Sequence, residues 1–295
     1  RAAAVRGGPG GARPVTRLTG CSSSANRDVP AGSLAVLSHR SLKSRTVKVA
    51  LMITCLGDVL RPQAGRATVR LLQRLGHDVT FPADQTCCGQ PFFNSGFAEL
   101  AQQQARHTID VFADAETVVV PSGSCAAMVK NEFPHLLAED STYHQRAEAL
   151  AARTFELADF LVNLLGVTDV GARYQGTGTH HYACHLRGIG GTDEVERLIR
   201  DVEGATYLPL THQDQCCGFG GSFAVRYPKI SSALVGGKAD CILATGADAV
   251  VSTDAGCLMN IGGKLHRDGR DVRVMHLAEL LDSGADDADA AAQRP

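Results

Sequence analysis

The sequence lacks any run of 18 or more apolar residues, and its acidic and basic residues nearly balance. Without such a run, no segment is predicted to span a lipid bilayer. A net charge of −2 gives no reason to expect nucleic acid or an anionic membrane as a general partner. No Gly-x-Gly-x-x-Gly motif stands between a predicted strand and a predicted helix, so nothing indicates a dinucleotide-binding loop. These absences leave the ten cysteines as the main chemical signal.

Eight of the ten cysteines fall into two sets with almost the same spacing. In each set, one cysteine stands 32 positions before an adjacent Cys-Cys pair (87 − 55 and 216 − 184), and glycine follows the pair. The last cysteine stands 37 or 40 positions beyond the pair (125 − 88 and 257 − 217). This repetition predicts an internal duplication in which each copy brings four thiols together. The first quartet is Cys55, Cys87, Cys88 and Cys125, and the second quartet is Cys184, Cys216, Cys217 and Cys257.

The number of cysteines does not indicate a secreted disulfide framework. Such frameworks belong to short chains that cannot build a hydrophobic core, whereas this chain has 295 residues, 44% of them hydrophobic. We also find no signal-peptide pattern before the predicted core. We therefore expect reduced thiols in a cytoplasmic protein.

The composition divides the chain into five predicted segments. Residues 1–45 hold seven Arg and one Lys against the single acid Asp28, which predicts a disordered basic tail; a transit peptide or a mis-called start remains an alternative. Residues 46–145 form the first repeat, 146–177 a connecting helix and 178–281 the second repeat. Residues 282–295 are predicted to be a disordered acidic tail.

Strand and helix patterns alternate in both repeats. We predict strands at 47–54, 79–81, 117–120, 179–183, 206–210, 249–253 and 272–275, and helices at 62–75, 96–113, 147–165, 195–202, 229–245 and 276–281. This order predicts an α/β fold of two duplicated, Rossmann-like halves with parallel sheets, related by internal pseudo-symmetry. Ligand sites of such sheets lie beyond the carboxyl ends of the strands, where all eight repeated cysteines stand. The four thiols of each quartet should therefore converge on one rim of their half.

Four converging thiolates bind zinc or an iron–sulfur cluster. Zinc sites commonly take their ligands as two close pairs, whereas each quartet here is a single cysteine, an adjacent pair and another single cysteine. Two adjacent cysteines can bind the same metal group only if the loop bends, and the glycine after each pair permits that bend. A cluster with several irons accepts two neighbouring thiolates more readily than one small ion does. We therefore favour an iron–sulfur cluster in each half. A zinc-binding scaffold and a vicinal disulfide at either pair remain alternatives, and Cys241 is interpreted as an apolar filler.

The motifs around both quartets resemble those of the cysteine-rich CCG-domain proteins, over roughly residues 47–281. This family includes a subunit of heterodisulfide reductase and the iron–sulfur subunits of glycolate and glycerol-3-phosphate oxidation. The resemblance rests on the segments at 54–58, 85–91 and 122–125 in the first half and at 215–221, 256–261 and 274–276 in the second. It implies that all eight cysteines of the two quartets bind iron–sulfur clusters, one in each repeat.

The sequence departs from the fuller family pattern at two positions. Fuller versions end each repeat in Cys-x-x-Cys, which gives five thiols, but Ser122 and Asp254 stand at the first position of that pair. Four ligands suffice for a 4Fe–4S cluster, which we therefore favour. Ser122 and Asp254 either supply an oxygen ligand or cap the following helix. His180, His181 and His185 flank Cys184 and either tune a cluster through hydrogen bonds or serve the structure alone.

The resemblance implies an electron-transfer subunit of a bacterial complex that oxidises L-lactate or another 2-hydroxy acid. Because iron–sulfur clusters pass single electrons, the hydride step would belong to partner subunits that carry a flavin or further clusters. A protein that cleaves disulfides directly, like heterodisulfide reductase, is the enzymatic alternative, and a glycolate oxidase subunit is the alternative within the same class.

Overall fold

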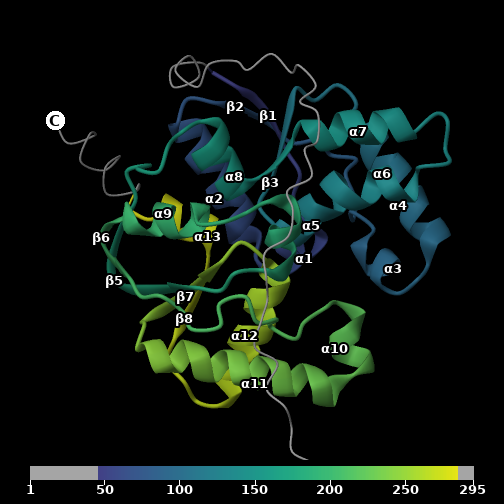
Figure 1. Cartoon of the computed structure of the whole chain (residues 1–295). Coiled ribbons are helices and arrows are strands. Elements are labelled where there is room, and N and C mark those ends of the chain that lie inside the picture. The colour runs from purple at the N-terminus through teal and green to yellow at the C-terminus, as the bar shows by residue number, and fades with distance from the viewer. Residues whose placement is uncertain (1–45, 285–295) are drawn as a thin grey trace, which may run out of the picture. The chain divides into compact units, whose positions relative to one another are not determined.

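The computed structural model describes residues 46–284, which lie in one unit of the chain (Figure 1). The predictions for residues 1–45 and for most of 282–295 fall outside these residues. Within 46–284, no helix has both the length and the apolar character needed to cross a membrane.

The first half forms a four-stranded parallel sheet in the order β2-β1-β3-β4. The run Thr117-Val118-Val119-Val120 forms the interior strand β3, because β-branched side chains pack well when both faces of a strand are covered. The elements of this half are β1 (Lys48–Leu51), α1 (Cys55–Leu60), α2 (Pro62–Arg74), β2 (Asp78–Thr80), α3 (Gln90–Asn94), α4 (Ala98–Val111), β3 (Thr117–Val120), α5 (Gly123–Ala127), the π-helix η1 (Met128–Glu132), α6 (Phe133–Leu136), α7 (His144–Ala152), β4 (Thr154–Glu156), α8 (Leu157–Asp159) and the π-helix η2 (Phe160–Leu164).

The second half repeats this topology in the order β6-β5-β7-β8, again with all neighbours parallel. Strand β6 is an edge strand that ends at Tyr207, so Pro209, which stands inside the predicted strand at 206–210, lies beyond it. The elements are β5 (Arg173–His180), the 3₁₀-helix η3 (Cys184–Ile189), α9 (Glu194–Arg200), β6 (Glu203–Tyr207), α10 (Ser222–Arg226), α11 (Pro228–Thr245), β7 (Ala249–Ser252), α12 (Ala255–Arg267), β8 (Arg273–His276) and α13 (Leu277–Asp282). The predicted α/β fold with two duplicated parallel sheets is confirmed.

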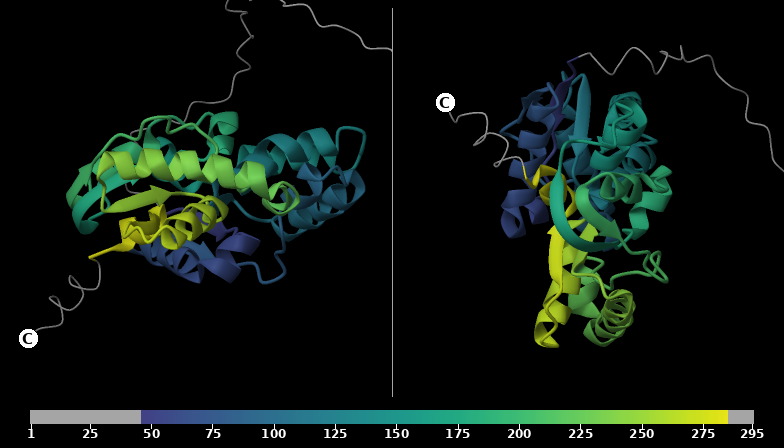
Figure 2. Two further views of the ribbon diagram at one scale, coloured as in Figure 1. Left: turned by 90° about the horizontal axis from the view of Figure 1, so that it is seen from below. Right: turned by 90° about the vertical axis from the view of Figure 1, so that its left-hand side faces the viewer.

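One layer of the core is shared by both halves. Val49 and Val119 of the first sheet and Val251 of the second belong to a single cluster of buried side chains, together with residues of α2, α8, η2, α9 and α13. Helix α13, the last of residues 46–284, packs against α2 of the first half, and the two lie side by side in Figures 1 and 2. The opposite face of each sheet has its own cluster, one under α4 to α7 and the other under α11 and α12.

The prediction of one continuous helix over residues 147–165 was wrong. Helix α7 ends at Ala152, and the next residues form β4, which pairs with β3. The chain then re-enters helix at Leu157, where the buried Glu156 accepts hydrogen bonds from the backbone N–H groups of Ala158 and Asp159. This short strand gives the first half its fourth strand, in the place that β8 takes in the second half.

Candidate metal centre

The first quartet converges at the carboxyl edge of the first sheet. Cys55 opens α1 after β1, Cys87 and Cys88 lie in the loop between β2 and α3, and Cys125 lies in α5 after β3. The sulfur of Cys55 is 3.5 Å from that of Cys87, and the sulfur of Cys88 is 3.4 Å from that of Cys125. Parallel strands end at the same edge, which brings together thiols that are up to 70 positions apart (125 − 55).

The second quartet has the same arrangement. Cys184 opens η3 after β5, Cys216 and Cys217 lie in the loop between β6 and α10, and Cys257 lies in α12 after β7. The sulfurs of Cys217 and Cys257 are 3.0 Å apart. The structure thus brings four thiols together in each half, and their role as metal ligands remains a prediction.

All eight cysteines of the two quartets line one cavity of about 110 Å³. The sequence predicted one rim in each half, and the structure turns the two rims toward each other. Gln90 and Asn94 of the first half and Phe219 and Gly221 of the second complete the walls, among other residues. Any groups that the quartets hold would therefore share one pocket.

Each quartet has two buried and two partly exposed sulfurs, in the same pattern. The buried ones are the second cysteine of each pair and the last cysteine of each set: Cys88, Cys125, Cys217 and Cys257. The other four are partly exposed. All eight line the cavity, but only Cys55, Cys87, Cys184 and Cys216 are also partly open to solvent.

Hydrogen bonds between the thiols favour a thiolate in each quartet. The hydrogen bond from the thiol of Cys55 is the main cause that lowers the pKa of Cys87 to about 3, and the thiol of Cys184 does the same for Cys216, whose pKa falls to about 2. The thiolate is the form of cysteine that binds metals. The first cysteine of each pair would thus offer a thiolate to a metal.

The bend that lets both cysteines of a pair face the cavity depends on glycine, as predicted. Gly89 has φ +84° and Gly218 has φ +79°, in the left-handed region that side chains with a Cβ disfavour. A Cβ at Gly218 would lie 2.6 Å from the carbonyl oxygen of Ser231, and one at Gly89 would lie 2.9 Å from the Cβ of Gln104. Each loop packs directly on the second helix that follows it, α4 in the first half and α11 in the second.

The two cysteine loops are anchored by different side chains. In the first half, the amide of Gln85 accepts a hydrogen bond from the N–H of Ile53 and donates to the carbonyls of Leu51 and Pro82. In the second half, the buried ammonium of Lys238 donates to the carbonyls of His212 and Gln213. Sequence reasoning missed both anchors, because neither residue belongs to the repeated pattern.

Ser122 and Asp254 cap helices, which is one of the two roles predicted for them. The hydroxyl of Ser122 accepts a hydrogen bond from the N–H of Cys125, and the carboxylate of Asp254 accepts from the N–H of Gly256. Asp254 also accepts from the hydroxyl of Ser122 and from the N–H of Ser124. Their oxygens therefore hold the starts of the two cysteine-bearing helices.

His276 ties the ends of the two sheets together. Its Nδ1 accepts a hydrogen bond from the N–H of Ala278, so Nε2 donates, and it lies 3.1 Å from the carbonyl oxygens of both Pro121 and Thr253. Burial lowers the pKa of His276 and keeps the ring neutral. These two carbonyls directly follow β3 and β7, so one imidazole fixes both edges that carry the quartets.

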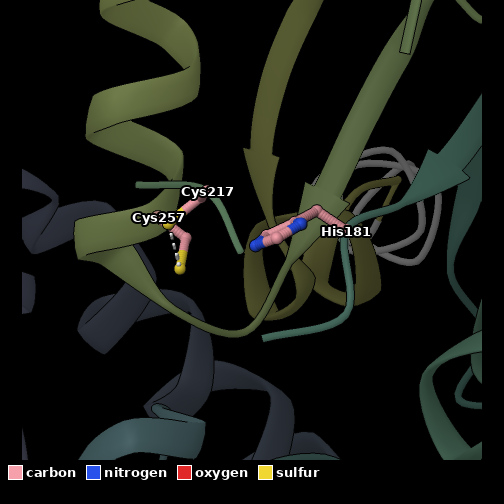
Figure 3. A group of neighbouring side chains, drawn as sticks. All are labelled: His181, Cys217 and Cys257. Atoms are coloured by element: carbon pink, nitrogen blue, oxygen red, sulfur yellow. Dashed lines mark hydrogen bonds between the residues drawn. The ribbon is translucent and has the colours of Figure 1, made fainter. Parts of the chain in front are cut away.

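The three histidines around Cys184 differ in their surroundings. Nδ1 of the exposed His185 lies 3.6 Å from the sulfur of Cys184. His180 and His181 are both buried, and burial lowers the pKa of each to about 3, so both rings are neutral. A ring nitrogen of His181, the sulfur of Cys217 and the sulfur of Cys257 all lie within 4.8 Å of one another (Figure 3). Sequence reasoning named His181 only as a neighbour of Cys184 and did not connect it with these two cysteines.

The nine cysteines of residues 46–284 are all free thiols, including both adjacent pairs. Cys241 lies on α11 and packs against the apolar cluster of the second half, but it is not among the residues that line the cavity; Cys21 lies outside the described residues. Four soft sulfur donors at each rim, with a thiolate in each set, suit an iron–sulfur cluster or a soft metal ion. The donor set therefore fits the predicted group.

The chain matches the family model described as "Cysteine-rich domain" (CCG) twice, over residues 49–130 and 179–262. It is 49% identical to lactate utilization protein A of Exiguobacterium sp. strain AT1b, over 81% of this chain and 99% of that protein. It is 46% identical to lactate utilization protein A of Bacillus licheniformis, over 80% of this chain and 100% of that protein. Both matches extend across the two repeats.

Similarity to solved structures is much weaker. Glutamate racemase from Francisella tularensis aligns over 84% of this chain and 82% of that chain, with 10% identity and a TM-score of 0.34. A putative Asp/Glu racemase from Yersinia pestis aligns over 84% of this chain and 100% of that chain, with 14% identity and the same TM-score of 0.34. These values are too low to support an argument about fold or function.

Proposed function

The chain belongs to the cysteine-rich CCG-domain family, and from this premise we propose that it is an iron–sulfur electron-transfer subunit of a complex that oxidises L-lactate. The lactate substrate follows from the printed name of its relatives, lactate utilization protein A. The observation that carries the electron-transfer role is the convergence of eight cysteines, as two quartets, on one cavity. Two sulfur-lined sites that face one pocket suit a protein that passes electrons.

The residues of the quartets would do the following. Cys87 and Cys216, whose pKa values are lowered by hydrogen bonds from neighbouring thiols, would offer thiolates to the group, and the other cysteines would bind it after losing their protons. The buried Cys88 and Cys217 hold the group from the side of the core, where water is excluded. When bound, an iron–sulfur cluster accepts and releases one electron at a time.

The oxidation of lactate to pyruvate releases two electrons and two protons, which single-electron carriers do not remove in one step. The sequence has no dinucleotide-binding motif, so we assign the hydride step to partner subunits that carry a flavin or further iron–sulfur clusters. Two quartets in one chain match the two electrons of each turnover. The partly exposed Cys55, Cys87, Cys184 and Cys216 mark the side of the site that is open to an electron donor or acceptor.

The first experiment is anaerobic purification, followed by measurement of iron and acid-labile sulfide and by EPR spectroscopy after reduction with dithionite. We expect about eight iron and eight sulfide per chain, as two clusters of four. In the presence of the partner subunits, L-lactate should produce the same EPR signal, and the isolated chain should show no reduction by lactate. Zinc without sulfide would overturn the electron-transfer role and support a zinc-stabilised scaffold.

Direct cleavage of a disulfide is the second candidate, because the cavity gives a small molecule access to both quartets. The cluster-loaded chain would then reduce a small disulfide without any partner subunit. We favour electron transfer because Ser122 and Asp254 replace the fifth cysteines of the fuller family pattern, and their oxygens already cap helices. Disulfide turnover at a rate comparable to that of the complete complex with lactate would reverse this preference.

A further inference from the structure

His181 is a buried imidazole without a hydrogen-bond partner. Its side chain follows β5, the residue is only 1% exposed, and neither ring nitrogen has a partner within residues 46–284. A buried polar group left unpaired destabilises the folded state, so native proteins rarely keep one without a reason. The described residues therefore offer no hydrogen-bond partner to this ring, and a bound group could fill that place.

The ring points toward the second quartet. One of its nitrogens lies within 4.8 Å of the sulfurs of both Cys217 and Cys257, and Figure 3 shows the imidazole directed at these two residues. Metal–nitrogen and metal–sulfur bonds are about 2.0–2.3 Å long. A nitrogen that lies within 4.8 Å of both sulfurs is therefore within reach of a group that these sulfurs hold.

The first half has a methionine where the second has His181. The backbone N–H of Met52 donates to the carbonyl of Val119 at 3.0 Å, and that of His181 donates to the carbonyl of Val251 at 2.9 Å. Val119 and Val251 occupy corresponding positions in β3 and β7, so Met52 and His181 are counterparts. Met52 is buried in an apolar cluster that contains Cys88 and Cys125. The duplication has thus kept this position beside both quartets but changed its chemistry.

We propose that His181 is a nitrogen ligand of the group held by the second quartet, which makes that site a five-donor site of four sulfurs and one nitrogen. This inference rests on the proposed iron–sulfur role. The first quartet, with Met52 at the corresponding position, binds its group through sulfur from cysteine alone. Because donor atoms set the reduction potential of an iron–sulfur centre, the two groups differ in potential, and electrons have a preferred direction between the halves.

The test uses the full chain labelled with ¹⁵N-histidine, purified anaerobically and reduced for pulsed EPR spectroscopy. The wild-type protein should show a strongly coupled histidine nitrogen. His181→Met, which places the residue of the first half in the second, should lose this coupling, and a redox titration should shift one of the two reduction steps while the other stays unchanged. His180→Met is the matched control, because His180 is equally buried and equally unpartnered but does not lie with Cys217 and Cys257. It should keep the coupling and both reduction steps.

Iron and acid-labile sulfide are measured on the same samples, so that the two proposals fail separately. A chain without iron and sulfide overturns both. A chain that carries iron and sulfide but shows no histidine coupling, or only the weak coupling of a hydrogen-bonded ring, overturns the ligand role of His181 alone. Coupling that persists in His181→Met does the same. If His181→Met does not fold, His185→Gln decides the question: it removes the imidazole that lies 3.6 Å from the sulfur of Cys184, and the coupling should persist in it. Loss of the coupling in His185→Gln would overturn the ligand role of His181.

Discussion

The carboxylate of Asp254 accepts a hydrogen bond from the hydroxyl of Ser122, across the boundary between the two halves. The two residues are counterparts, because each stands three positions before the last cysteine of its quartet (125 − 122 and 257 − 254). Asp254 also accepts from the N–H of Ser124 and from that of Gly256. One carboxylate therefore caps helices of both halves and fixes the distance between the two rims.

Removing this carboxylate should loosen both cysteine-bearing helices. Asp254→Ala is expected to lower the free energy of unfolding by about 1–3 kcal/mol, because it removes a cap and leaves buried donors unpaired. Urea unfolding measures this change. The control is Asp268→Ala, which removes a partly exposed ion pair with Lys264 and should cost less than about 1 kcal/mol. If both substitutions lower the free energy of unfolding equally, the hydrogen bonds of Asp254 contribute no more to stability than a partly exposed ion pair.

The two quartets should load independently. Cys88→Ser and Cys217→Ser are each expected to remove about half of the iron, because each substitution takes a buried sulfur from one quartet only. Iron analysis and EPR of the anaerobically purified variants check this. Cys241→Ser should keep all of the iron, since Cys241 lies on α11 outside both quartets. Complete loss of iron from either single variant would contradict two separate sites.

The bends at the two Cys-Cys pairs should respond differently to a methyl group. Gly218→Ala is expected to cost about 2–4 kcal/mol, since it combines a left-handed residue with a contact to the backbone oxygen of Ser231. Gly89→Ala should cost about 1–3 kcal/mol, because its closest contact is a side chain, the Cβ of Gln104. Chemical denaturation and iron content measure both effects.

Gly263→Ala is the control for these two variants. Gly263 lies inside α12, and nothing lies within 4 Å of its added Cβ. The substitution should leave the iron content unchanged and stabilise the protein by up to about 1 kcal/mol, because alanine favours helix more than glycine does. A larger loss of stability in Gly89→Ala than in Gly218→Ala would contradict the packing argument.

Glu156 should make stability fall as the pH rises. Burial raises the pKa of Glu156 from 4.5 to about 8 in the folded protein. Between these two values the folded protein holds a proton that the unfolded chain has released, so the free energy of unfolding falls with rising pH, by up to about 1.4 kcal/mol per pH unit. Glu156→Gln keeps an oxygen for the N–H groups of Ala158 and Asp159 and should flatten this slope.

Urea unfolding at pH 5, 6.5 and 8 checks the effect of Glu156. The control is Glu139→Gln, because Glu139 is exposed and lies between α6 and α7. In this variant the free energy of unfolding should fall with pH as steeply as in the wild-type protein. If the wild-type and Glu156→Gln proteins show the same slope, Glu156 is ionised in the folded state and the proposed linkage is wrong.

Much of the fold was readable from local patterns. Helix α2 was predicted from Pro62, which suits a first helical turn, and from an apolar stripe that includes Ala67, Leu71 and Leu72. The side chains of these three stripe residues are buried in the core. β4 was missed because Leu150 and Leu157 fit one helical spacing although they lie on separate helices, α7 and α8. A strand of three residues leaves no periodicity for the sequence to show.

The arrangement of the site was only partly predictable. The spacing of the cysteines predicted that the four thiols of each half converge, because it follows from where parallel strands end. It did not predict that both quartets line one cavity, since that depends on contacts between distant segments. The bond from His276 to the carbonyl of Pro121, for example, joins residues 155 positions apart. The role of Lys238 was hidden for the same reason, because a lysine within a helix is normally on the surface.

The last helix of each repeat packs on the other repeat: α13 lies against α2, and α8 lies against α9. A polypeptide with a single repeat would leave this apolar helix without a surface to cover, unless it paired with a second copy of itself. Each repeat thus covers a helix of the other, and the two sheets depend on one another for burial of their last helices. This mutual cover holds the two quartets against one cavity although they lie on separate sheets.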